Sequence, residues 1–211
     1  MIYLSFYKQE NRLAKASFDQ LLQSIPIHLQ DKILKFRNWQ DAERSLAGKI
    51  MLMRGLRHIG RNEYSLNDLK YSEFQKPFFD ESIHFNISHS GNYIICAISE
   101  TNQVGVDVEE LNEIPMDDFT NLFDNREWEE VISAENKFRA FYTLWTKKEA
   151  FLKLIGCGLN QPLNEVAILN NRLIWENKEL FLSEIALDSQ HIAYLCTDVI
   201  SPVVQVQEIH L

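Results

Sequence analysis

Three acidic side chains and one lysine are spaced so that they could act together on a phosphate group. Asp107 and Glu109 stand two residues apart in the run Val-Gly-Val-Asp-Val-Glu of residues 104–109. As a strand, this run would place both carboxylates on one face and its valines on the other. Glu149 and Lys153 stand four residues apart, which is one turn of a helix. Neighbouring carboxylates raise each other's pKa unless a cation neutralises them, and an all-oxygen set of ligands suits Mg²⁺.

Both patterns also have a structural interpretation without chemistry. Asp107 and Glu109 could be solvated acids on an edge strand. Glu149 and Lys153 could form an exposed ion pair, which stabilises a helix by only about 0.2–0.5 kcal/mol. The spacing of either pair, taken alone, therefore does not decide between a metal site and a solvated surface.

A third polar motif, Ser88-His89-Ser90-Gly91, follows an apolar segment. Together with Asp107 it suggests a hydrolase triad, but adjacent residues on a strand point to opposite faces, so Ser88 and His89 do not pair with each other. The chain also lacks the Gly-x-Ser-x-Gly turn that exposes a nucleophilic serine in α/β-hydrolases. A polar turn that ends in glycine is better suited to hydrogen bonding a phosphate. We therefore reject the triad and keep Ser88 and His89 as candidates for phosphate binding.

The element that must position Glu149 and Lys153 has a regular apolar pattern. Large apolar residues recur at three- and four-residue spacing over residues 138–155, which predicts a helix with one face in a core. Gly156 and Gly158 follow, and both can adopt the positive φ that often ends a helix.

The element that must position Asp107 and His89 is predicted to be a three-stranded meander over residues 83–110. Upstream, a long helical region is predicted over residues 31–59, in one or two pieces, and downstream further helices over residues 114–137. Later strands are predicted at residues 166–169, 173–175, 180–185, 192–197 and 203–209. This order predicts the α+β class, with two halves of similar size at residues 1–102 and 103–211.

The composition limits the class of protein. A chain of 211 residues with 45% hydrophobic residues can bury a full core, and no apolar run is long enough to cross a bilayer. Three widely spaced cysteines form neither a disulfide framework nor a metal motif, which favours a reducing, cytoplasmic location. The net charge is −9, yet residues 1–102 carry 13 Lys and Arg against 11 Asp and Glu. The first half could therefore bind a small polyanion, whereas the whole chain is poorly charged for coating nucleic acid.

Three motifs in this chain together resemble those of the 4′-phosphopantetheinyl transferases. They are Phe-Asn-Ile-Ser-His-Ser-Gly at residues 85–91, Gly-Val-Asp-Val-Glu at residues 105–109, and Trp-Thr-Lys-Lys-Glu-Ala-Phe-Leu-Lys at residues 145–153. The run over residues 35–46 and the pair Lys76-Pro77 extend the resemblance to the larger, single-chain type that activates surfactin synthetase. Any one motif is weak evidence, but all of them in this order and spacing are specific.

The resemblance implies a fold and an activity. The fold would consist of two halves related by a pseudo-two-fold axis, each a small antiparallel sheet with packed helices, with coenzyme A and Mg²⁺ held between them. The activity would be the Mg²⁺-dependent transfer of the 4′-phosphopantetheine arm from coenzyme A to a serine of an apo acyl or peptidyl carrier protein. Adenosine 3′,5′-bisphosphate would be released.

The resemblance also implies roles for the residues at matching positions. Asp107, Glu109 and Glu149 would hold Mg²⁺, and Glu149 is our candidate for the base that takes the proton of the carrier serine, although it could be a ligand only. Lys153 and His89 would contact the pyrophosphate and assist the reaction. The residues expected to bind the phosphates and adenine end of coenzyme A are Lys32, Arg44, Ser45, Lys76, Ser88, His89 and Lys153.

Two other functions could use the same residues, a Mg²⁺-dependent phosphohydrolase and a non-catalytic module that binds coenzyme A or a nucleotide. We favour the transferase, acting as a cytoplasmic monomer on coenzyme A and a carrier protein, with neither nucleic acid nor membrane as a partner. The sequence departs from the family at Gln75, because the family commonly has glycine before the Lys-Pro pair. The backbone turn that aims Lys76 would therefore have to form without glycine.

Overall fold

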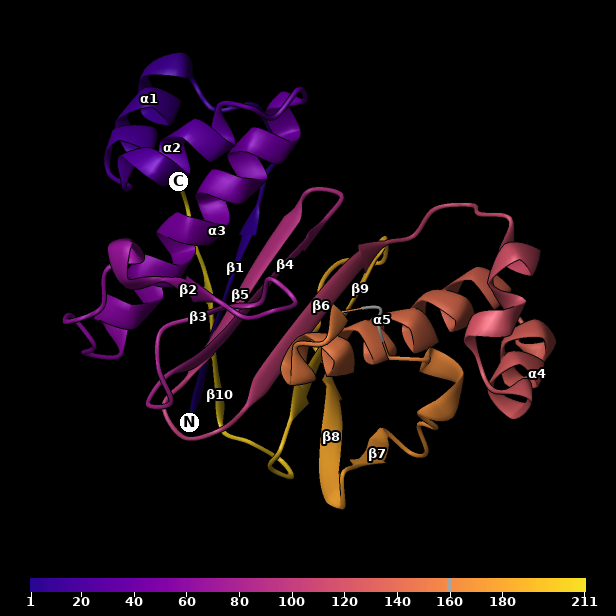
Figure 1. Ribbon diagram of the computed structural model, residues 1–211. Helices are drawn as coiled ribbons and strands as arrows, with labels where there is room; N and C mark the ends of the chain where they lie inside the picture. The colour runs from indigo at the N-terminus through magenta and orange to yellow at the C-terminus, as the bar shows by residue number, and fades with distance from the viewer. Residues whose placement is uncertain (159–160) are drawn as a thin grey trace.

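Two four-stranded sheets with helices packed on them make up most of the chain (Figure 1). The computed structural model describes residues 1–158 and 161–211. The mixture of helices and mainly antiparallel strands confirms the predicted α+β class. Within the described residues, no helix combines the length and apolar character needed to cross a bilayer.

The first sheet has the strand order β10-β1-β5-β4 and is antiparallel except for the parallel pair β1 and β10. Its strands are β1 (Ile2–Lys8), β4 (His84–Ser90), β5 (Tyr93–Ser99) and β10 (Val204–Glu208). The helices of this half are α1 (Lys15–Gln23), α2 (Ile27–Ile33) and α3 (Trp39–His58). A short hairpin of β2 (Lys70–Tyr71) and β3 (Pro77–Phe78) follows the 3-10 helix η1 (Leu66–Asp68).

The second sheet has the strand order β6-β9-β8-β7 and is antiparallel throughout. Its strands are β6 (Val104–Glu110), β7 (Arg172–Trp175), β8 (Lys178–Glu184) and β9 (His191–Thr197). Its helices are α4 (Asn125–Ser133) and α5 (Lys137–Ile155), with the 3-10 helices η2 (Met116–Leu122) and η4 (Leu163–Glu165).

Helix α5 confirms the helix predicted from the apolar spacing. Its first turn is capped by Asn136, whose side chain accepts a hydrogen bond from the N–H of Arg139. Gly156 follows its last residue with a φ of 76°, a left-handed conformation that glycine adopts without steric cost. The helix packs on the second sheet, so its position fixes that of Glu149 and Lys153.

The continuous apolar run of β5 is explained by burial on both faces. Ile94, Cys96 and Ile98 face the core that α3 covers, whereas Ile95 and Ala97 face a second apolar cluster between the two sheets. That second cluster contains Ile2 and Leu4 from β1 and, from the other sheet, Val104, Val106, Val108, Ala193 and Leu195. The valine face of β6 predicted from the alternation is therefore the face that joins the two halves.

Three predictions need correction. β6 does not complete a meander with β4 and β5, because it pairs with β9 and begins the second sheet. Residues 166–169 are not a strand, and only an isolated bridge joins Leu169 to Arg172. The predicted second half at residues 103–211 loses its last strand to the first sheet, because β10 pairs in parallel with β1. A pattern of apolar residues defines a strand but not the partner with which the strand pairs.

The hairpin of β2 and β3 turns at the residue where the sequence departs from the family. Gln75 has a φ of 63°, in the left-handed region that glycine tolerates and other residues adopt at a cost of about 1–2 kcal/mol. The Ser72 side chain accepts a hydrogen bond from the N–H of Lys76 at 3.1 Å and supports the turn. The turn thus keeps a glycine-like conformation although glycine is absent.

We expect replacement of Gln75 by glycine to stabilise the protein, because glycine adopts the left-handed conformation without strain. Glycine also makes the unfolded chain more flexible, which offsets only part of this gain. The expected gain is about 0.5–1 kcal/mol, which raises the Tm by roughly 1–4 °C in a chain of this length. Thermal unfolding followed by circular dichroism would measure it. Gln75→Val is the matched control, and its β-branched side chain should lower the Tm. The opposite order of the two Tm values would contradict this account of the turn.

Candidate active site

The site is built where the edge of one sheet meets the edge of the other. β4 and β6 lie side by side as the edge strands of their sheets (Figure 1), yet side chains rather than backbone pairing bridge them. From Asn86 to Ser90, every second side chain of β4 accepts a hydrogen bond from a backbone N–H of β6, and we call this set the side-chain ladder. The bonds run from Val106 to Asn86 Oδ1 at 3.1 Å, from Val108 to Ser88 Oγ at 3.3 Å, and from Glu110 to Ser90 Oγ at 3.1 Å.

Asp107 lies on β6 between two members of this ladder and is 2% exposed. Its Oδ1 accepts hydrogen bonds from Ser88 Oγ at 2.8 Å and from Lys153 Nζ at 2.5 Å. Its Oδ2 is also buried and has no hydrogen-bond partner among the described residues. Burial raises the pKa of Asp107, and the neighbouring Lys153 ammonium opposes this rise.

Glu109 repeats this arrangement two residues further along β6. Its Oε2 accepts a hydrogen bond from Ser90 Oγ at 2.8 Å, and its Oε1 accepts one from Trp145 Nε1 at 3.2 Å. Burial raises the pKa of Glu109, and the negative charge of Asp107 raises it further. Asp107 and Glu109 are therefore each held by a serine of β4 and by one residue of α5.

Glu149 faces the same two carboxylates from helix α5. Burial, followed by the negative charge of Asp107, raises its pKa to about 7. Its side chain makes no hydrogen bond within the described part of the chain, although the charges of Asp107, Glu109 and Lys153 all act on it. The structure therefore brings together the three predicted carboxylates and Lys153.

A divalent cation fits the chemistry of these donors. All three are carboxylates, which suit Mg²⁺, and the unpartnered Oδ2 of Asp107 is a buried acceptor. The present geometry is not a closed cage, because among residues 1–158 and 161–211 no three His, Cys, Asp or Glu side chains lie close enough to enclose a metal ion. Mg²⁺ commonly binds one or two protein carboxylates and completes its coordination with waters and substrate phosphates, so an incomplete set is compatible with it.

His89 lies between Ser88 and Ser90, and the alternation of the strand turns it to the opposite face. Part of its ring is open to solvent. Crowding by protein atoms, and after it the positive charges of Arg44 and Lys153, lower the pKa of His89. Arg44 itself donates to the carbonyl of Gly91 at the tip of the β4–β5 hairpin and pairs with Asp41 at 3.4 Å. His89 is therefore in a positively charged setting that favours an anion.

The remaining predicted residues lie on α2, α3 and the β2–β3 hairpin. The Lys32 ammonium lies 5.1 Å from the centre of the Tyr71 ring. Ser45 Oγ accepts a hydrogen bond from Lys49 Nζ at 2.9 Å. Lys76 Nζ donates to the carbonyl of Leu154 near the end of α5 at 2.6 Å, so it bridges the two halves, and burial lowers its pKa.

The expected phosphate contact of Ser88 conflicts with its surroundings. The hydroxyl is 4% exposed, donates to Asp107 and accepts from Val108 and Lys153. A hydroxyl has one proton and two lone pairs, so these three bonds use all of its capacity. In this structure Ser88 is a part of the interface between the halves, and it is not oriented toward an external phosphate.

Sequence reasoning missed four residues of the site. Asn86 and Ser90 had a usable signal, because they share the strand period of two with Ser88. Trp145 also had one, since it precedes Glu149 by one helical turn. The half-buried Lys49 had none beyond its spacing of four from Ser45. Burial, followed by the positive charge of Lys32, lowers the pKa of Lys49 to about 8.

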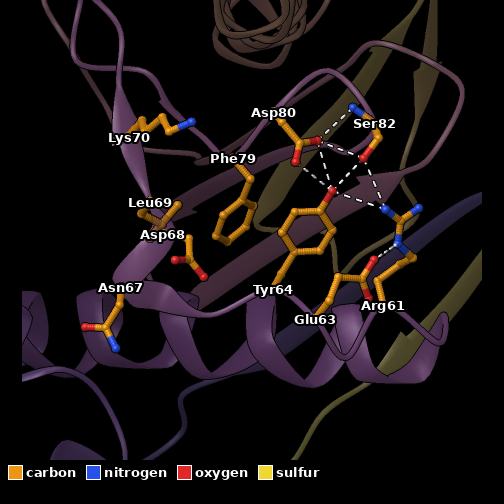
Figure 2. Close-up of a pocket in the computed structure, with 10 residues that line it drawn as sticks. All are labelled: Arg61, Glu63, Tyr64, Asn67, Asp68, Leu69, Lys70, Phe79, Asp80 and Ser82. Atoms are coloured by element: carbon orange, nitrogen blue, oxygen red, sulfur yellow. Dashed lines mark hydrogen bonds and ion pairs between the residues drawn. The ribbon is translucent and has the colours of Figure 1, made fainter.

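A separate hollow of about 740 Å³ lies between the end of α3, η1 and the β2–β3 hairpin (Figure 2). None of the predicted site residues lines it. Figure 2 shows its side chains bonded to one another, with the Tyr64 hydroxyl donating to Asp80 and Arg61 donating to Tyr64 and Ser82. This network holds the segment that follows β3 against the segment that follows α3. It therefore supports the hairpin that carries Lys76.

Comparisons with known proteins agree with these motifs. Residues 103–194 match the family model of the 4′-phosphopantetheinyl transferase superfamily, and residues 12–101 match that of the 4′-phosphopantetheinyl transferase N-terminal region. The chain is 34% identical to the 4′-phosphopantetheinyl transferase gsp of Aneurinibacillus migulanus over 82% of this chain and 73% of the relative. It is 29% identical to the 4′-phosphopantetheinyl transferase Sfp of Bacillus subtilis over 74% of this chain and 71% of the relative.

A solved structure is also similar over part of the chain. The holo-[acyl-carrier-protein] synthase of Thermotoga maritima superposes with a TM-score of 0.38 at 20% sequence identity. The superposition covers 45% of this chain and 61% of that protein.

We expect Gly105→Ala to separate β6 from α5. A Cβ at this position would overlap the carbonyl oxygen of Ala150 and the backbone of Leu154, which cannot move without shifting the helix. The expected loss of stability is about 1–3 kcal/mol, measured as a lower Tm. Gly48→Ala is the control, because its Cβ would meet only the flexible Ile87 side chain at 3.1 Å. Equal Tm values for the two variants would show that the close approach at Gly105 is not a constraint.

Proposed function

Because this chain belongs to the 4′-phosphopantetheinyl transferases, we propose that it transfers the phosphopantetheine arm of coenzyme A to a serine of an apo carrier protein in a reaction that requires Mg²⁺. The observation that carries this proposal is the meeting of Asp107, Glu109, Glu149 and Lys153 at the junction of the two sheets. Adenosine 3′,5′-bisphosphate is the other product.

Asp107, Glu109 and Glu149 would hold the Mg²⁺ ion. Bound there, Mg²⁺ would neutralise charge on the pyrophosphate of coenzyme A and on the departing bisphosphate. The support is the oxygen-only donor set and the unpartnered Asp107 Oδ2. The pKa values of all three carboxylates are raised by burial, so a nearby cation would favour their charged forms.

Two residues would bind the pyrophosphate. Lys153 places its ammonium at Asp107, where it can donate to a phosphate oxygen beside the carboxylates. His89 lies on the hairpin tip near the charges of Arg44 and Lys153, which would also attract a phosphate. Fixed donors of this kind stabilise negative charge that develops on a leaving phosphate.

Glu149 would accept the proton of the carrier serine, directly or through a water molecule. Its pKa of about 7 suits a base that works near neutral pH, because such a group is partly deprotonated and still basic. Its carboxylate makes no hydrogen bond to the described residues, so no partner in this part of the chain holds it away from a substrate.

The 3′-phosphate and adenine end would bind in the first half through Lys32, Arg44, Ser45 and Lys76. We propose Lys49 as a further member of this set. Its ammonium donates to the hydroxyl and the carbonyl of Ser45, at 2.9 and 3.1 Å, and its pKa is sensitive to Lys32. Lys49 is half-buried and Lys32 is exposed, and an anion bound near both would offset the repulsion between their charges.

The protein would act as a monomer in the cytoplasm. Residues of both halves of one chain contribute to the site, which supports a complete site within a monomer. The buried thiols of Cys96 and Cys196 form no disulfide, in keeping with a reducing compartment.

The first experiment mixes the protein with coenzyme A, Mg²⁺ and an apo carrier protein, and follows the carrier by intact mass. We expect a gain of one phosphopantetheine that is lost with a carrier lacking its serine and on removal of Mg²⁺ by a chelator. Asp107→Asn should slow the transfer by at least about 100-fold, since it removes a buried charged ligand. The control Asp19→Asn makes the same change in an exposed ion pair with Lys15 and should transfer normally. Binding of coenzyme A without any gain in mass would favour a non-catalytic module.

A second experiment tests the role of Lys49 through pH. Because the pKa of Lys49 is about 8, its positive charge is present below that pH and is lost above it. We expect kcat/KM for coenzyme A to fall by about tenfold at pH 9 relative to pH 7, since a charged hydrogen bond to phosphate is lost. Lys49→Arg keeps its charge at both pH values and should not show this fall. Lys49→Met should have a low kcat/KM for coenzyme A at both pH 7 and pH 9. The same fall with 3′-dephospho-coenzyme A would contradict a contact between Lys49 and the 3′-phosphate.

A further inference from the structure

Two serines of β4 make the same pair of bonds to β6. Ser88 accepts from the N–H of Val108 and donates to the carboxylate of the preceding residue, Asp107. Ser90 accepts from the N–H of Glu110 and donates to the carboxylate of the preceding residue, Glu109. The repetition follows from the period of two along both strands, since positions 88 and 90 of β4 face positions 107 to 110 of β6. The serines thus connect the backbone of β6 to its own acidic side chains.

The direction of these bonds is fixed by the chemistry of the partners. A backbone N–H can only donate and an ionised carboxylate can only accept, so each serine hydroxyl must accept from the first and donate to the second. One oxygen of each carboxylate, Oδ1 of Asp107 and Oε2 of Glu109, is therefore occupied at 2.8 Å. The rotation of each carboxylate is restricted, and the Oδ2 atom of Asp107 is left without a protein partner in the described residues.

We propose that Ser88 and Ser90 are positioning residues that hold Asp107 and Glu109 in the orientation needed to bind the divalent cation. This inference rests on the proposed function of the same site, because it assumes that the two carboxylates are metal ligands. Partners that orient the ligands of a metal ion commonly contribute 10–100-fold to its affinity. Neither serine needs to touch the metal or the substrate for this effect.

Asn86 provides a matched control within the same ladder. It accepts from the N–H of Val106 at 3.1 Å, as the serines do from their partners. Among the described residues it donates to no carboxylate, and its side-chain nitrogen reaches only the carbonyl of Lys153, at 3.5 Å. Truncation of the Asn86 or the Ser90 side chain leaves one backbone N–H of β6 without its partner. The two substitutions therefore remove the same number of backbone hydrogen bonds from the interface. Only the loss of Ser90 also releases a carboxylate.

The test measures binding of Mn²⁺, used alone as a probe for the cation, to the intact protein by electron paramagnetic resonance of the free ion. We compare the wild type with Ser90→Ala, Ser90→Thr and Asn86→Ala, and record the Tm of each. Ser90→Ala should bind Mn²⁺ about tenfold more weakly, and Ser90→Thr, which keeps the hydroxyl, should stay within about twofold of the wild type. Asn86→Ala should lower the Tm but leave the Mn²⁺ affinity within about twofold.

Two outcomes overturn the inference while the proposed function stands. One is unchanged Mn²⁺ affinity in Ser90→Ala when the wild type binds Mn²⁺ and modifies the carrier. The other is an equal loss of affinity in Asn86→Ala and Ser90→Ala, which would assign the effect to the interface as a whole. If the wild type transfers phosphopantetheine but takes up no Mn²⁺, the metal site itself is wrong and the inference falls with it. Absence of transfer, with the expected difference in Mn²⁺ affinity, would overturn the proposed reaction and leave the role of the serines supported.

Discussion

The site depends on a junction at which two sheet edges meet without pairing their backbones. An edge strand has a row of N–H groups that need partners once they are buried. Asn86, Ser88 and Ser90 supply these partners from β4, at the strand period of two. The ladder also fixes the direction of the residues between its members. On β4, His89 points away from β6, and on β6, Asp107 faces Ser88. A shift of one residue along either strand would reverse all of these directions.

Charge at this junction is unbalanced in a way that suits a phosphate and a cation. Among the described residues, the buried Asp107 and the half-buried Glu109 and Glu149 face one ammonium, that of Lys153. Burial raises the pKa of each carboxylate, which means that their charged forms are disfavoured in the protein alone. On the first half the imbalance is reversed, because Lys49 is repelled by Lys32. In each half, a bound ligand of the opposite charge would lower the electrostatic free energy. This is a property of binding sites and not of stable cores.

Sequence patterns predicted the elements and the acidic cluster better than they predicted how the elements associate. The apolar spacing gave the bounds of α5 to within a residue, and the alternation gave the two faces of β6. The partner of β6 and the return of β10 to the first sheet were out of reach, because pairing depends on contacts between segments far apart in the chain. Ser88 was assigned to phosphate because its type and turn fit, whereas its burial depends on the strand that packs beside it. Lys49 was missed for the same reason.

The rotation of α5 about its axis is fixed from its far side by a buried lysine. Lys148 is completely buried, donates to the carbonyls of Leu163 and Val166 at 2.7 and 2.8 Å, and pairs with Glu127 at 2.7 Å. Successive helical residues differ by about 100° in direction, so fixing Lys148 toward α4 and η4 turns Glu149 toward β6. Gly105 lets the helix approach β6 on that side. A buried ammonium adds little net stability, but its bonds are directional, and the direction of Glu149 is what they determine.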